Sequence, residues 1–414
     1  MSDRTPRDQL VKYLTDAHSI EEQALAQLRV APDIAGTGRL ADVLAEHLPE
    51  TENHERAVRD RLETLGGSPS TVKDVVMAAG GKGFILFARS QADTPGKLLA
   101  HAYSYEHLEL AAYRLLAIVA DRAGDTETMS LANDIAEEER LMGERLAACY
   151  DEAADDAIAR VDPGGVESAL TSYLADAHAL EQQAITLLGR AATIAGDPAF
   201  VEIYERYLEE SREHATAVER RLGAHDSGPS TLKDAAMRLG GLNWSAFFQA
   251  HPDTPGKLAA FAYAFEHLEI AGYELLARVA AHAGDEHTRD LCMDILTQER
   301  AAAGAIAGTF ERYAITVAPS GERSPVEMSS GALIRTRRRS SSGSGFCSGG
   351  GLMFGPRGIS IELASSAGTG SRMWACTTSG RACGRSCRST SPSSRGSEMT
   401  PVSIEAAATA GEQR

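Results

Sequence analysis

The chain has 414 residues, 43% of them hydrophobic, which is enough for two or three domains with apolar cores. Its formal net charge is −17, but the segment from Ala318 onward carries twelve Arg, six Glu and neither Lys nor Asp, so the residues before it carry about −23. Such an acidic body disfavours nucleic acid and anionic membranes as partners and is compatible with cation binding.

The N-terminus, MSDRTPRDQL, lacks the apolar core of a signal peptide. No run further along the chain approaches the ~18 apolar residues of a membrane-spanning helix. We therefore expect a cytoplasmic protein.

Most of the remaining sequence is an internal duplication of one unit. LTDAHSIEEQAL at Leu14 returns as LADAHALEQQAI at Leu174, and DTPGKLLAHAYSYEHLELAAYRLL returns as DTPGKLAAFAYAFEHLEIAGYELL, each at an offset of 160 residues. This period is too long for a solenoid repeat, so each copy is predicted to be a complete domain. The predicted domains are residues 1–160 and 161–317.

Within each copy, apolar residues and a few polar ones recur at spacings of three and four, the pattern of one helix face. Four such stripes in the first copy begin at Leu10, Leu44, Leu99 and Ile135. Thr94 and Pro95 provide an N-cap and a first-turn proline for the third helix, and the PSTVKD stretch before it predicts a short extra helix. Four long amphipathic helices with one long crossover predict an all-α fold of two tandem ferritin-like four-helix bundles.

Residues 318–414 form a tail rich in Ser, Gly and Arg, without sustained periodicity. This composition cannot bury enough apolar surface to offset chain entropy, so the tail is predicted to be disordered. Its Arg335–Arg339 run suits either a solvated basic linker or a nucleic-acid contact, and we favour the linker. The abrupt change in composition is also what a shifted reading frame would produce.

Five glutamates lie on the apolar stripes of each copy, where an ionised carboxylate is costly unless it is paired or bound to metal. A histidine, His54 or His214, lies one turn beyond the glutamate of the second helix. No Lys or Arg lies on the stripes near these acids. The glutamates are Glu21, Glu50, Glu106, Glu109 and Glu139 in the first copy and Glu181, Glu210, Glu266, Glu269 and Glu299 in the second.

Comparison of the two copies separates these acids from others. Several glutamates of the first copy change in the second, among them Glu22, Glu55 and Glu138, which become Gln182, Ala215 and Gln298, as we expect of surface charges. The stripe acids and the histidine do not change. Two divalent cations per bundle would cancel the repulsion among the carboxylates. A protonated or hydrogen-bonded buried network is the alternative. For His107 and His267, a place beside the site or at the surface is expected.

At these residues the sequence resembles the YciE/YciF-type ferritin-like family, a stress-associated group. The matching pieces are DAHSIEEQAL, HLPETENHERAV, EHLELAAY and EEER, over about residues 8–150 and again 168–313. The resemblance implies a four-helix bundle with a di-iron or di-manganese site, in which Glu21, Glu50, Glu106 and Glu139 would be primary ligands, with His54 and Glu109 beside them. The fusion of two such units suggests a built-in dimer and self-association.

The sequence therefore leaves three hypotheses and identifies neither a substrate nor a catalytic residue. The first is a di-metal carboxylate protein, with two iron or manganese ions per bundle, in stress response or in iron or oxidant handling. The second is a non-catalytic helical stress protein whose acidic cluster is a structural network. The third, a nucleic-acid-associated protein acting through its tail, is disfavoured by the acidic body.

Overall fold

The computed structural model describes residues 5–69, 94–160, 165–195, 198–230 and 254–315, and every regular element in these ranges is a helix. Most of the predicted PSTVKD helix and the whole predicted disordered tail, 318–414, lie outside the described residues. The described residues of both copies belong to one compact unit, so the two copies can be described together.

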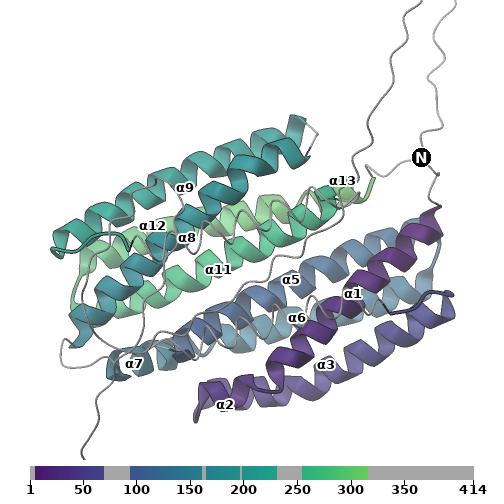
Figure 1. Cartoon of the computed structure of the whole chain (residues 1–414), viewed down its shortest axis with the longest axis horizontal. Helices are drawn as coiled ribbons and strands as arrows, with labels where there is room; N and C mark the ends of the chain where they lie inside the picture. Colours follow the sequence, from purple (N-terminus) through teal and green to yellow (C-terminus); the bar gives the residue numbers. More distant parts are fainter. Residues whose placement is uncertain (1–4, 70–93, 161–164, 196–197, 231–253, 316–414) are drawn as a thin grey trace, which may run out of the picture. The chain divides into compact units, whose positions relative to one another are not determined.

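The first copy contains four long helices that run alongside one another (Figure 1). The first of them packs on the second and third, and the third packs on the fourth. Two short helices complete the copy. The long helices are α1 (Pro6–Leu28), α3 (Arg39–Thr64), α5 (Thr94–Ala123) and α6 (Thr126–Ala147), and the short ones are α2 (Ala31–Ala35) and α7 (Tyr150–Arg160).

The second copy repeats this arrangement, with the same pairs of long helices in contact. One difference is local: where the first copy breaks into α1 and α2, the second has one continuous helix. Pro32 in the first copy corresponds to Ala192, and proline cannot donate the backbone hydrogen bond of a helix interior. The helices are α8 (Gly165–Ala195), α9 (Pro198–Ala224), α11 (Thr254–Ala283), α12 (Glu286–Ala307) and α13 (Phe310–Ile315).

Local signals explain where several helices begin. Thr5 caps α1 through a capping box with Asp8, and Asp125 caps α6 by accepting from the Thr128 backbone N–H at 3.0 Å. The α5 helix begins at Thr94, beside the proline that the sequence analysis singled out. The Arg61 guanidinium ties the end of α3 to this cap, with an Nη2–carboxylate distance of 2.6 Å to Asp125.

The two copies contact each other mainly through the equivalent helices α5 and α11. The His107 and His267 rings stack there, with centroids 3.6 Å apart and planes 17° from parallel. Reciprocal ion pairs join Lys97 to Asp176 at 2.7 Å and Lys257 to Asp16 at 3.1 Å, as expected for a pseudo-twofold interface. The two histidines therefore pack between the copies and not at the surface. Self-association of whole chains stays a prediction.

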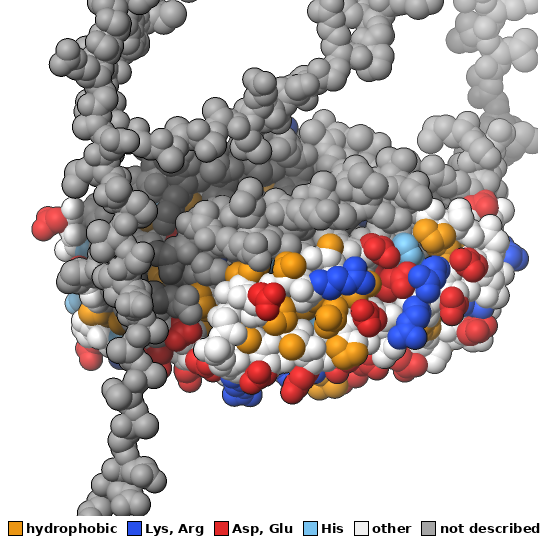
Figure 2. Space-filling view, turned by 60° about the horizontal axis from the view of Figure 1, so that its bottom comes forward, with side chains coloured by type: hydrophobic (Ala, Val, Ile, Leu, Met, Phe, Trp, Pro, Cys, Tyr) orange, Lys and Arg blue, Asp and Glu red, His pale blue; other side chains and the backbone are white. Residues whose placement is uncertain are grey.

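Figure 2 shows one face of the molecule, on which acidic, basic and apolar side chains are interspersed over the described residues. Exposed ion pairs such as Arg140 with Glu137, at 2.7 Å, contribute little to stability. No helix in the described ranges is both long and apolar enough to cross a membrane.

Candidate metal centres

The four long helices of the first copy direct a set of polar side chains into the bundle core. The α1 helix provides Glu21, α3 provides His47 and His54, α5 provides Glu106 and Glu109, and α6 provides Glu139. All six are at most 4% exposed. A helix stripe that buries its apolar members necessarily buries the polar residues on the same face, which is how the sequence places carboxylates in the core.

The Glu139 carboxylate lies between two His/Glu groups. Its Oε1 is 2.8 Å from His54 Nδ1, and its Oε2 is 3.5 Å from His47 Nε2. The first group is Glu21, His54 and Glu139, and the second is His47, Glu106 and Glu139. In each group, one ligand atom per residue lies within 4.8 Å of the others. A carboxylate shared in this way can bridge two cations.

Each histidine is oriented by a second carboxylate on its other ring nitrogen. His47 Nδ1 lies 2.8 Å from Glu50, and His54 Nε2 lies 2.5 Å from Glu138. Proteins commonly fix metal-binding imidazoles by a hydrogen bond from the far nitrogen to a carboxylate. These contacts therefore fix the orientation of both rings, with the opposite nitrogens facing Glu139.

Glu50, predicted to be a primary ligand, does not join either group. Its side chain is 38% exposed and pairs with Arg145 Nη2 at 2.5 Å as well as with His47. Arg145 does not belong to the stripe of α6, yet its guanidinium reaches the carboxylate of Glu50 from beside that stripe. The hydrogen bond from His47, and then Arg145, lowers the Glu50 pKa to about 2.

Glu109 lies in the core, outside the two groups, with a different environment. Both of its oxygens are buried without a hydrogen-bond partner, as is Oε2 of Glu21. The other oxygen of Glu21 accepts a short hydrogen bond from the Tyr113 hydroxyl. Buried polar atoms without partners are costly, and a bound cation would satisfy them.

Without a cation, protons must neutralise the cluster. Burial, followed by the charge of Glu139, raises the pKa of Glu21 to about 8. Burial alone would lower the pKa of His47, but the neighbouring carboxylates, Glu106 foremost, raise it to about 11. Burial and the other acids also raise the pKa of Glu109 well above its ordinary value. Each shift shows that the ionised carboxylates need positive charge nearby.

The donor set therefore fits a pair of divalent cations. If ionised, the buried carboxylates of Glu21, Glu106, Glu109 and Glu139 carry four negative charges, which two divalent ions balance. Carboxylate oxygens and imidazole nitrogens together suit iron, manganese or zinc. These buried His/Glu groups could hold metal ions, and the donors alone do not select among those metals.

The cluster of the second copy contains one histidine fewer than that of the first copy. Glu181, His214 and Glu299 form one group, with His214 Nδ1 2.9 Å from Glu299 and 3.5 Å from Glu181. The other group consists of Glu266, Glu269 and Glu299. Glu299 is thus shared, as Glu139 is.

The remaining predicted ligand, Glu210, stays outside these groups, as Glu50 does, and Arg206 Nε lies 3.9 Å from its carboxylate. At the position of His47 the second copy has Tyr207. His47 was not among the predicted ligands, although it lies seven residues before His54 on the same stripe.

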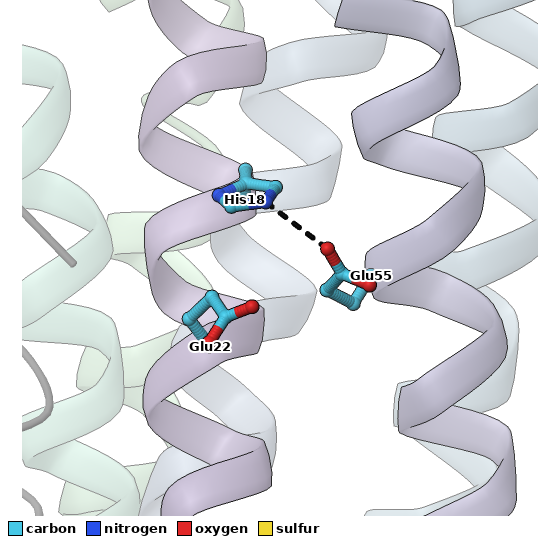
Figure 3. A group of neighbouring side chains, drawn as sticks. All are labelled: His18, Glu22 and Glu55. Atoms are coloured by element: carbon cyan, nitrogen blue, oxygen red, sulfur yellow. Dashed lines mark hydrogen bonds and ion pairs between the residues drawn. The ribbon is translucent and has the colours of Figure 1, made fainter. Parts of the chain in front are cut away.

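A third His/Glu group lies beside the core of the first copy. His18 and Glu22 lie on adjacent turns of α1, and Glu55 approaches from α3 (Figure 3). His18 Nε2 is 3.1 Å from Glu55, which also pairs with Arg59 at 2.9 Å. Glu55 is only 6% exposed, so the interpretation of this changing acid as a solvated surface charge was wrong. Glu138 is exposed, although it contacts His54.

A surface groove of about 510 Å³ leads to the carboxylates that orient the two histidines. Glu50, Glu138 and Glu144 line it together with Arg145. A separate cavity of about 20 Å³, room for roughly one water molecule, touches Glu106.

Comparison with known proteins agrees with this architecture. No solved structure matches the chain. A family model described as a domain of unknown function, DUF892, matches residues 5–159 and again residues 166–316. The chain therefore belongs to DUF892, the YciE/YciF ferritin-like family, and carries its domain twice in tandem.

Proposed function

We propose that this protein binds pairs of iron or manganese ions within its helical bundles and serves in stress response, in the handling of iron or oxidants. The observation that carries the proposal is the position of Glu139, whose two oxygens face two different His/Glu groups. The predicted ligands Glu21, Glu106 and Glu139 belong to these groups, together with His54. The stress role rests on the family alone.

In the proposed site, the chain's own residues hold and prepare the ions. Glu139 would bridge the two positions, Glu21 and His54 would complete one, and Glu106 and His47 the other. Glu50 and Glu138 keep the imidazoles turned toward the core. Bound iron or manganese would supply one-electron chemistry toward oxygen or peroxide. The apolar bundle around the cluster would exclude bulk water.

The competing function is a non-catalytic stress protein whose acids form a structural, proton-sharing network. The raised pKa values of Glu21 and His54, to about 8 and about 9, show that protons can also neutralise the core. The two functions differ in the sign of one effect. A metal ligand stabilises the loaded protein, whereas an acid in a repelling network destabilises it.

The test measures metal per chain and melting temperature on the full chain, purified without chelator and incubated anaerobically with Fe(II) or Mn(II). Glu106→Gln should lower the metal content of the first copy and the melting temperature of loaded protein. Glu46→Gln, at an exposed position of α3, is the matched control. Wild-type protein that retains no metal, together with a stabilised Glu106→Gln variant, would favour the structural network instead.

A further inference from the structure

The two candidate centres differ at one buried donor, and the difference has a chemical consequence. His47 presents Nε2 to Glu106 at 3.3 Å and to Glu139 at 3.5 Å. The equivalent position in the second copy is Tyr207, whose side chain is equally buried at 4% exposure. The carboxylates on either side, Glu266 and Glu299, are unchanged.

The Tyr207 hydroxyl is already engaged by a cation of the chain. It accepts a hydrogen bond from Arg206 Nη2 at 2.9 Å, and the guanidinium lies 4.8 Å from the centre of the tyrosine ring. In the first copy, the residue at the position of Arg206 is Glu46. The second copy therefore replaces a nitrogen donor by a phenol and adds a positive charge beside it.

The remaining donors of that group are three carboxylates. Glu266, Glu269 and Glu299 each place an oxygen within 4.8 Å of the others, and no histidine belongs to this group. Imidazole favours transition ions such as Co(II) and Zn(II), whereas all-oxygen sets suit hard cations such as Mg(II) and Mn(II). The other group of each copy, which contains His54 or His214, keeps a nitrogen donor.

We propose that the two copies are unequal metal centres. The first binds two nitrogen-seeking transition ions, and the second binds one, at Glu181, His214 and Glu299. The all-carboxylate group of the second copy, Glu266, Glu269 and Glu299, takes a hard cation instead. This inference rests on the proposed function, because it presupposes that the clusters hold metal. The residue at the position of His47 and Tyr207 would thus decide which metal ion the neighbouring carboxylates bind.

The test is a Co(II) titration of the full chain in excess Mg(II), followed by the visible absorption of the cobalt ion. Tyr207→His should add one tightly held Co(II) per chain, because it restores the imidazole. His47→Tyr should remove one and weaken cobalt binding at that position at least about tenfold. Tyr207→Phe is the matched control, because it removes the hydroxyl without adding a nitrogen, and its Co(II) count should equal that of the wild type.

These counts are read as differences, because the His18, Glu22 and Glu55 group would add the same ion to every variant. Helicity of each variant is checked by circular dichroism. A second measurement uses the wild type alone: in Mn(II)-loaded protein, excess Mg(II) should displace one Mn(II) per chain and leave the rest bound. Displacement of all ions or of none would contradict the inference.

The outcomes separate the two proposals. Unchanged Co(II) counts in Tyr207→His and His47→Tyr would overturn the unequal centres and leave the proposed function standing. Failure of the wild type to bind any of the metals would overturn both. A gain with Tyr207→His and a loss with His47→Tyr supports both.

Discussion

The two copies share their main contacts at the ends of the second long helices, α3 and α9. They differ more around their acid clusters. Arg61 ties α3 to Asp125 at 2.6 Å and to Thr128 at 2.8 Å, and Arg221 ties α9 to Asp285 at 2.7 Å, with the same contact to Thr288. The core clusters keep their glutamates but differ in the residues around them.

This contrast separates two kinds of constraint. The arginine at the helix end contacts both the capping aspartate and the threonine of the next helix, so the contact requires all three residues. The surroundings of the core acids can vary while the fold survives, because the bundle requires only that the acids be neutralised. His47, Glu138 and Arg145 become Tyr207, Gln298 and Ala305. The changes therefore gather around the proposed ligands and alter their chemistry.

The largest expected effect comes from the shared carboxylate. Glu139→Gln removes one negative charge and one bridging oxygen, so the first copy should lose up to two ions per chain and the loaded protein should melt several degrees lower. Glu299→Gln should cost the second copy less Co(II), because only one nitrogen-containing group is affected there. Metal analysis and thermal unfolding measure both. Glu138→Gln, which gives the residue of the second copy, is the control, and a loss as large in that variant would remove the special role of Glu139.

The next effect concerns the histidine stack between the copies. Burial, and then the neighbouring His107, lowers the pKa of His267 to about 3, so the folded protein keeps this ring neutral. The unfolded chain takes up a proton as pH falls below about 6.5, so stability is present above that pH and is lost between about 6.5 and 3, by on the order of 4 kcal/mol.

Urea unfolding of metal-free protein across this pH range measures the loss. His267→Gln should flatten the dependence, whereas His287→Gln, at an exposed position, should leave it unchanged. An equal slope in wild type and His267→Gln would show that this ring does not control the interface.

A smaller effect is expected at the helix ends. Arg61→Ala leaves Asp125 without its guanidinium partner and should cost about 3 kcal/mol. Arg221→Ala should cost less, because His225 Nε2 still lies 2.8 Å from Asp285, whereas the first copy has Leu65 at the position of His225. Chemical denaturation of the metal-free variants tests this, with Arg140→Ala as an exposed arginine control. Equal losses would show that His225 does not compensate for the missing guanidinium.

The smallest effect is expected at Arg145, which has no counterpart in the second copy. Its pair with Glu50 is about one-third exposed on each side, so Arg145→Ala should cost at most about 1 kcal/mol after solvent screening. The lowered pKa of Glu50 contributes stability above about pH 4.5 that is lost as pH falls toward 2. The variant should show a weaker loss over that range in acid unfolding. A decrease of several kcal/mol in the free energy of unfolding at neutral pH would show that Arg145 supports the core.

The sequence by itself determined the helices, the duplication and most of the buried acids. Helix periodicity is a local property, so the stripes that carry Glu21, Glu106 and Glu139 are visible without any knowledge of packing. The offset of 160 residues supplied the second copy for the same reason. Both the all-helical fold and the family resemblance are confirmed by the structure and the family match.

Only the tertiary structure decided which polar side chains meet. Glu50 and His47 lie on one stripe, yet Glu50 turns to Arg145 at the edge while His47 reaches Glu139 across the core. Glu55 likewise contacts His18 of α1, and His107 stacks on His267 of α11, contacts that no local pattern in the sequence reveals. A stripe fixes the direction of a side chain only to within part of a helix turn. The final contacts depend on how neighbouring helices pack and on which opposite charge lies within reach.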